Sequence, residues 1–95
     1  MESIIDNKKE CFRCRTTQGL HKHHIFFGVA NRRKSDEDGC WIWLCGKHHN
    51  LSNDGIHFNK DFDTAIKQLA EQRWIDHYDK SKEDFLVRYG RNYLD

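Results

Sequence analysis

Residues 40–49 read CWIWLCGKHH, in which an apolar run ends at a cysteine and two histidines follow. The apolar run predicts a strand covered on both faces, because a strand exposed on one side would alternate with polar residues. Cys45 and His48 are separated by two residues, and an earlier pair, Cys11 and Cys14, has the same spacing. Two such pairs are typical of a closed tetrahedral zinc site, since each tight turn directs two ligands at one point. The sequence therefore predicts a structural zinc ion that joins two distant segments.

The four cysteines leave two alternatives open. They could pair as two disulfides, as in small secreted domains, but the mostly polar segment 1–10 shows no apolar leader, which favours a reducing cytoplasm. Cys40 could also replace His48 as the fourth zinc ligand. Cys40 stands five residues before Cys45 in the expected strand, where side chains at that spacing point to opposite faces. His48 is therefore the preferred ligand, and Cys40 is interpreted as a buried thiol.

Length and charge limit the number of domains and the kinds of partner that can be expected. A chain of 95 residues is expected to form a single domain, 1–95, whose modest core makes a bound ion important. No apolar run approaches the roughly 18 residues of a membrane span, so no membrane partner is expected. The net charge is +1, yet residues 1–34 carry eight basic and three acidic side chains. Such a basic half indicates either a polyanionic partner or ordinary solvated surface.

Residue patterns order the chain as a hairpin followed by helices. Residues 20–27 are rich in strand formers, and the polar, charged segment 28–38 predicts a surface loop before the second strand. Residues 47–53 are expected to form a short helix. Apolar residues at three- and four-residue steps over 62–78 predict an amphipathic helix, and 81–90 carries the capping residues of another. The expected fold class is α+β.

The remaining histidines gather at two places. His21, His23 and His24 end the first expected strand, and His49 directly follows a zinc ligand. Neighbouring side chains of a strand face opposite ways, so His23 and His24 can serve one site only if the strand bends there. One imidazole could then bind a metal while the other acts as a base, since an ordinary histidine pKa is about 6.5. The zinc ion would bring His49 back against this strand and so build a second, open metal site.

The order of these motifs resembles the HNH or ββα-metal (His-Me finger) endonucleases. A CxxC pair, a strand ending in adjacent histidines and a hydrophobic strand running into CxxHH are similar to the zinc-knuckle branch that includes phage endonuclease VII. The segments HHIFFG, GIHFN and YGRNYL are also similar to small HNH-type proteins of phages and prophages. The nuclease resemblance covers about residues 11–53.

This resemblance implies a ββα-metal hairpin-helix core with a zinc knuckle over about residues 11–58, and a tail of two helices over about 59–95. It implies a metal-dependent DNA endonuclease of phage or prophage recombination or DNA processing, working in bacterial cytoplasm. His24 occupies the position of the general base that deprotonates water, while His23 and His49 ligate the catalytic ion. The resemblance leaves the remaining ligand open among His57, Asn50 and Asn53.

Neutral imidazole ligands favour Zn, Ni or Mn over Mg as the catalytic ion. The implied partner is DNA, and candidate phosphate contacts are Arg32, Arg33, Lys34 and His21, with ordinary surface charge as the alternative. Cys40 stands where many members have an asparagine that braces the hairpin loop, and Asn31 is a candidate substitute. The helical tail is compatible with a homodimer or with docking on its own hairpin.

Two further expectations concern function and core. The alternative function is a zinc-stabilised adaptor that binds nucleic acid or protein without cleaving it, and it needs only the first ion. An adaptor has no use for the histidine constellation, so the sequence favours the enzyme. Phe26, Phe27, Trp41 and Trp43 are assigned to the core, because no spacing distinguishes a base-stacking platform.

Overall fold

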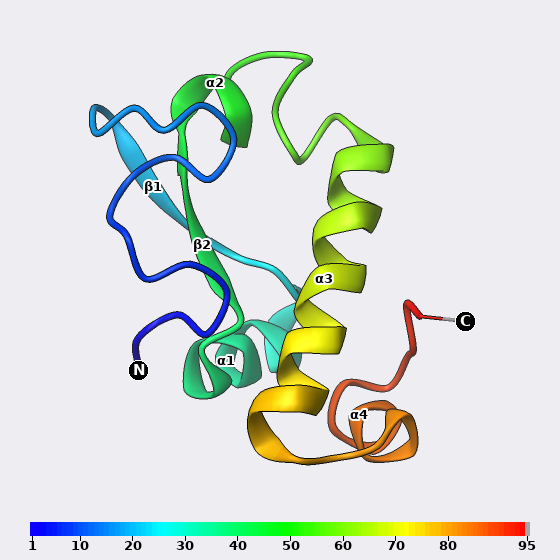
Figure 1. Cartoon of the computed structure of the whole chain (residues 1–95). Helices are drawn as coiled ribbons and strands as arrows, with labels where there is room; N and C mark the ends of the chain where they lie inside the picture. The colour runs from blue at the N-terminus through cyan, green and yellow to red at the C-terminus, as the bar shows by residue number, and fades with distance from the viewer. Residues whose placement is uncertain (95) are drawn as a thin grey trace.

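The computed structural model describes residues 1–94. Within them, two antiparallel strands, β1 (Leu20–His24) and β2 (Trp41–Cys45), form a hairpin sheet. The helices are α1 (Val29–Asp38), α2 (Gly46–His49), α3 (Lys60–Tyr78) and α4 (Lys82–Tyr89). Figure 1 shows the hairpin beside the long α3, with α2 at one end of the sheet and α1 at the other. The α+β class expected from the sequence is confirmed.

The hairpin register decides which side chains meet the helices. Leu20 pairs with Cys45 and His24 with Trp41. Because side chains alternate along a strand, His21 and His23 share one face of β1. Four of the five β2 residues are buried, as expected for a covered strand. The N-terminal segment protects the outer edge of β2, where the Phe12 N–H donates to the Trp43 carbonyl at 2.8 Å.

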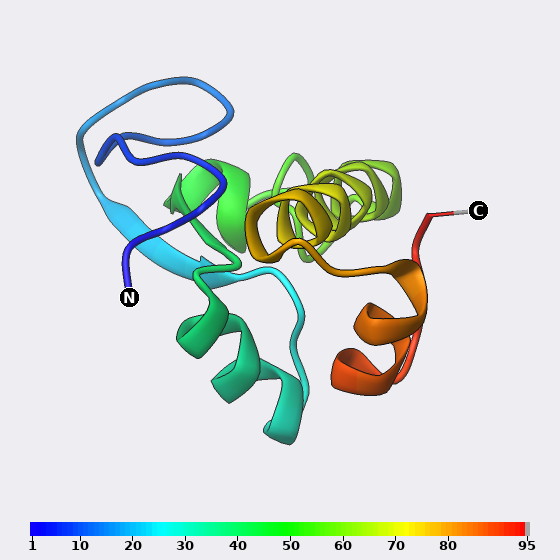
Figure 2. The same ribbon diagram turned by 60° about the horizontal axis from the view of Figure 1, so that its bottom comes forward.

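Residues 29–38 form a helix, so the expected surface loop was wrong. The segment VANRRKSDED has no apolar stripe, and its buried residue is Ser35. The Ser35 hydroxyl donates to the Phe26 carbonyl at 2.8 Å and accepts from the Phe26 N–H at 3.0 Å. Gly39 ends the helix in the left-handed conformation, with φ of 75°. Hydrogen bonds attach α1, and a search for hydrophobic periodicity cannot detect that kind of attachment. Figure 2 shows α1 brought forward, at the end of the sheet.

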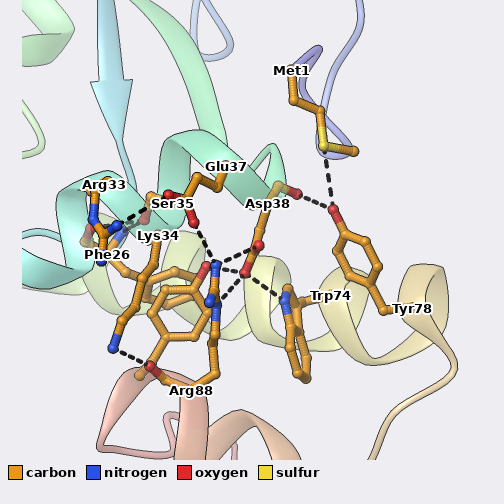
Figure 3. Close-up of polar contacts among 11 residues, drawn as sticks. Met1, Phe26, Arg33, Lys34, Ser35, Glu37, Asp38, Trp74, Tyr78 and Arg88 are labelled. Atoms are coloured by element: carbon orange, nitrogen blue, oxygen red, sulfur yellow. Dashed lines mark hydrogen bonds and ion pairs between the residues drawn. The ribbon is translucent and has the colours of Figure 1, made fainter.

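Asp38, the last residue of α1, connects this helix to α3 and α4 (Figure 3). Its carboxylate accepts hydrogen bonds from Trp74 Nε1 at 2.9 Å and Arg88 Nε at 3.0 Å. The Tyr89 hydroxyl donates to the same carboxylate at 2.7 Å. The Asp38 carbonyl accepts from the Tyr78 hydroxyl at 2.8 Å. These bonds fix α1 between the hairpin and the helical tail.

The two tail helices follow the expected pattern. The Asn59 side chain caps α3, and Ser81 and Asp84 form a capping box at α4, which ends at Gly90. Apolar side chains of both helices share one core with the hairpin, including Ile25, Phe26, Ile42, Leu44, Phe62, Ile66, Trp74, Phe85 and Tyr89. The apolar stripe of the tail is thus covered by its own chain. Across residues 1–94, no helix combines the length and apolar character that crossing a membrane requires.

Candidate metal centres

The first cluster joins the N-terminal turn to the end of β2. Cys11, Cys14, Cys45 and His48 place their ligand atoms within 4.8 Å of one another. Cys14 Sγ lies 3.7 Å from Cys45 Sγ, and His48 Nδ1 lies 3.7 Å from Cys11 Sγ and 3.3 Å from Cys45 Sγ. Tetrahedral zinc, with bonds of about 2.3 Å to sulfur and about 2.0 Å to nitrogen, separates two sulfurs by about 3.8 Å and sulfur from nitrogen by about 3.5 Å. The observed spacing therefore fits zinc, and all four cysteines are free thiols.

The thiols of the chain differ in their readiness to ionise. Burial opposes ionisation of Cys11, but hydrogen bonds from the backbone of Cys45 and of its own turn prevail and lower its pKa to about 6. The lowered pKa favours the thiolate of Cys11, the form that binds zinc. Burial raises the pKa of Cys40 to about 12, and Cys40 lies outside the cluster. His48, as expected, completes the cluster that could bind a metal, and Cys40 is a buried thiol.

A second cluster brings together His23 on β1, His49 on α2 and His57 in the loop before α3, with ring nitrogens within 4.8 Å of one another. His49 Nε2 and His57 Nε2 are 3.1 Å apart. Two nitrogens bound to one ion at about 2.1 Å would be separated by roughly 3.0 to 3.4 Å. The loop folds back on α2, because the His57 N–H donates to the His49 carbonyl at 3.2 Å. Asn50 and Asn53 are exposed and do not line the pocket that these histidines share.

His23 is the buried member of this histidine cluster. Its side chain is 2% exposed, and its Nε2 has no hydrogen-bond partner within residues 1–94. An unpartnered buried polar atom costs about 1–3 kcal/mol, and a metal ion bound at this nitrogen would offset that cost. Burial, followed by the neighbouring His49 and His57, lowers the pKa of His23 to about 3. Burial and His57 lower the pKa of His49 to about 4. Both imidazoles are thus neutral at physiological pH, the state that binds metals.

His21 lies behind His49, on the same strand face as His23. The Nδ1 atoms of His21 and His49 are 3.0 Å apart. When His49 carries its proton on Nδ1, this N–H donates a hydrogen bond to His21 Nδ1. The lone pair of His49 Nε2 then points toward His57. Outer partners that select the tautomer in this way are typical of metal-bound histidines. His21 is not among the residues that line the pocket, and its ring lies against His49.

His24 lies beside the cluster and lines the same pocket, which has a volume of about 240 Å³. β1 ends at His24 and the chain bends at the next two residues, as the use of both adjacent histidines requires. His24 Nε2 lies 3.3 Å from Asp36 Oδ1 on α1. Hydrogen bonding, above all from Lys22, holds the pKa of Asp36 below its usual range, so this carboxyl is charged. The other residues lining the pocket are Lys22, Phe27, Arg32, His23, His49 and His57.

The basic candidates have different surroundings. Arg32 lines the histidine pocket, whereas Arg33 pairs with a glutamate one helical turn away at 3.5 Å. Lys34 Nζ donates to a backbone carbonyl of α4 at 2.8 Å, and Asn31 donates to the last carbonyl of α4 at 3.1 Å, so both residues attach α1 to the helical tail.

Lys22 also lines the pocket, and it was not predicted from the sequence. The available signal was its position in β1 two residues before a candidate base.

Comparisons with protein-family models, with curated proteins and with solved structures found no match. The chain has an α+β fold and a Cys3His cluster that could bind a metal. Beside that cluster lies the pocket with three convergent histidines and a fourth next to them.

Proposed function

We propose that this chain is a metal-dependent DNA endonuclease with a ββα-metal core formed by β1, β2 and α2. The observation that carries the proposal is the buried, unpartnered His23 Nε2, which lies with His49 and His57 in one pocket. The pocket also contains His24 and two basic side chains, a set suited to a phosphodiester. The chain departs from the HNH pattern in having α1 between the strands and an α2 of only four residues.

The Cys3His ion has a positioning role in this proposal. It holds the turn around Cys11 against the residues at the start of α2. Because His48 and His49 are consecutive, an ion that fixes His48 also fixes His49 opposite β1. The structural zinc thus assembles the second cluster, and the geometry for sulfur and nitrogen ligands supports its identity.

The residues of the pocket have different roles in the proposed reaction. His23, His49 and His57 hold a divalent ion, with Zn, Ni or Mn favoured over Mg by the nitrogen ligands. Such an ion, when bound, supplies Lewis acidity that neutralises charge on the phosphate and on the leaving oxygen. His24 donates its Nε2 proton to Asp36, which leaves Nδ1 to take the proton of the attacking water. Lys22 and Arg32 bind phosphate oxygens.

A plasmid-nicking assay tests the proposal. We expect the zinc-loaded chain with added Mn²⁺ or Ni²⁺ to nick supercoiled DNA, and His24→Ala to lower the rate at least about 100-fold, the usual contribution of a general base. The matched control is His77→Ala, an exposed histidine on α3, which should cleave at the normal rate. Unchanged cleavage by His24→Ala would remove the proposed base. No cleavage by a chain that binds one zinc and also binds DNA would favour the adaptor.

A further inference from the structure

We infer that the substrate of this site is an unpaired nucleic-acid strand, whose bases stack on Phe27 and Phe58 as its backbone passes the histidine pocket. The inference rests on the proposed function for the chemistry, but it concerns a separate surface, on the side of the pocket toward α3. None of the phosphate contacts expected from the sequence lies on this surface.

Two further depressions follow one another from the histidine pocket, each sharing lining residues with the one before. A second depression, of about 370 Å³, shares Phe27 and His57 with that pocket and is also lined by Phe58. A third, of about 320 Å³, shares Lys60 and Asp63 with the second and reaches the segment after α4. Figure 1 shows that segment returning along α3. We call the second and third depressions together the α3 groove.

Exposed aromatic rings stand at the entrance of the α3 groove. Phe27 is 47% exposed, so its assignment to the core was wrong, and Phe58 is 63% exposed. Lys67 Nζ lies 4.1 Å from the centre of the Phe27 ring and makes a cation–π contact with one face of it. Phe58 immediately precedes the cap of α3, a position where apolar residues often pack on the fourth helical residue. Here that residue is Asp63, so helix capping does not account for the exposed Phe58 ring.

The charges along the α3 groove suit a phosphate backbone. Lys60 and Arg91 are exposed and line it. Asp63 lies in the same groove, but its carboxylate is paired with Lys67 Nζ at 2.8 Å, which limits its repulsion of a phosphate. The groove therefore combines cationic groups with aromatic faces, the combination used by proteins that bind single strands.

An intact duplex does not match this combination. Its base faces are stacked inside the helix, and it presents phosphates and groove edges to a protein. The rings of Phe27 and Phe58 would then lie against solvent or sugar. An unpaired strand offers base faces and phosphates together, so it can occupy the α3 groove while one of its phosphates reaches the histidine pocket.

The test is a binding measurement with the full zinc-loaded chain carrying His24→Ala, so that cleavage does not interfere. Fluorescence anisotropy compares a labelled single strand with the same strand annealed to its complement. We expect tighter binding of the single strand, and about tenfold weaker single-strand binding by Phe58→Ala, the loss of one stacked base. Duplex binding should not change. The matched control is Leu86→Ala, an exposed apolar residue of α4 away from the groove.

A charge variant tests the other half of the groove. Lys60→Gln should weaken single-strand binding and reduce the slope of log affinity against log salt by about one phosphate contact. Lys80→Gln, an exposed lysine beyond α3, is the control and should leave both unchanged.

The outcomes separate this inference from the proposed cleavage. Duplex binding as tight as single-strand binding, or no effect of Phe58→Ala on the single strand, would overturn the inference even in a chain that nicks plasmid. Weakened single-strand binding by Phe58→Ala in a chain that cleaves nothing would support the groove and contradict the endonuclease.

Discussion

His23 and His49 stay neutral in the folded chain at pH values where a free histidine takes up a proton, since burial and the neighbouring imidazoles lower their pKa values to about 3 and about 4. In the unfolded chain both titrate near their usual pKa of about 6.5. The unfolded state therefore binds more protons as the pH falls from about 6.5 toward 4, and the free energy of unfolding decreases over that range. We expect a lower urea midpoint at about pH 5 than at about pH 7, and a smaller difference for His23→Gln.

His77→Gln is the control for this pH dependence, because His77 is an exposed residue in the last turn of α3. It should retain the full difference between the two midpoints. Protonation of the zinc ligands affects both variants alike, so comparing them isolates His23. Identical pH dependence in the two variants would show that His23 ionises in the folded protein as it does in the unfolded chain.

Cys14 and Cys40 offer a second comparison at the residue scale. Cys14 Sγ lies 3.7 Å from Cys45 Sγ in the Cys3His cluster, whereas Cys40 is fully buried outside it. We expect Cys14→Ser to lose zinc and its stabilisation, on the order of 10 kcal/mol at neutral pH, and hence to unfold. Cys40→Ala should keep one zinc per chain and lose about 1 kcal/mol. Metal analysis and circular dichroism measure both, and zinc loss confined to Cys40→Ala would reverse the assignment.

At the scale of elements, α1 depends on Asp38. Asp38→Ala would leave the Tyr89 hydroxyl and Trp74 Nε1 without their acceptor, and Tyr89 is 5% exposed. It would also remove one of the two carboxylates that pair with Arg88. We expect a loss of about 3 kcal/mol in urea unfolding, as for two buried donors deprived of their acceptor. DNA cleavage should fall as well, because α1 carries Arg32, which lines the pocket, and Asp36, which contacts His24.

The neighbouring Glu37 provides the control for this prediction. It also pairs with Arg88, at 3.1 Å, but its side chain is 48% exposed. Solvent screens such a pair, so Glu37→Ala should cost less than about 1 kcal/mol. Equal losses for the two variants would mean that Asp38 is no more than a surface charge.

At the scale of the whole molecule, we expect the histidine cluster to depend on the Cys3His cluster, and not the reverse. An ion bound by the Cys3His cluster would connect the N-terminal turn with α2 and so position His49, whereas His57 is not a member of that cluster. We expect His57→Ala to keep zinc and to lose binding of a second ion, and Cys14→Ser to lose both. Cobalt substitution reports this, because a thiolate-to-cobalt charge-transfer band marks the first cluster alone. A second ion bound normally by Cys14→Ser would disprove the dependence.

The Cys3His cluster and helix α3 could be predicted from the sequence alone. The spacing of Cys11, Cys14, Cys45 and His48 predicted the ligands that meet, and a 3.6-residue apolar pattern predicted α3. Both signals lie within short segments. Helix α1 was not predicted, because hydrogen bonds of the Ser35 and Asp38 side chains attach it to the rest of the fold.

Only the tertiary structure decided which side chains surround the histidine pocket. The sequence left the third ligand open, and His57 joins because its loop bonds back to the α2 backbone. Asp36 meets His24 once α1 forms, and Phe27 is exposed because the chain bends after β1. These contacts join residues far apart in the chain, so neither spacing nor periodicity records them. The sequence determined the residues of the Cys3His cluster that could bind a metal, and long-range packing determined which side chains surround the neighbouring pocket.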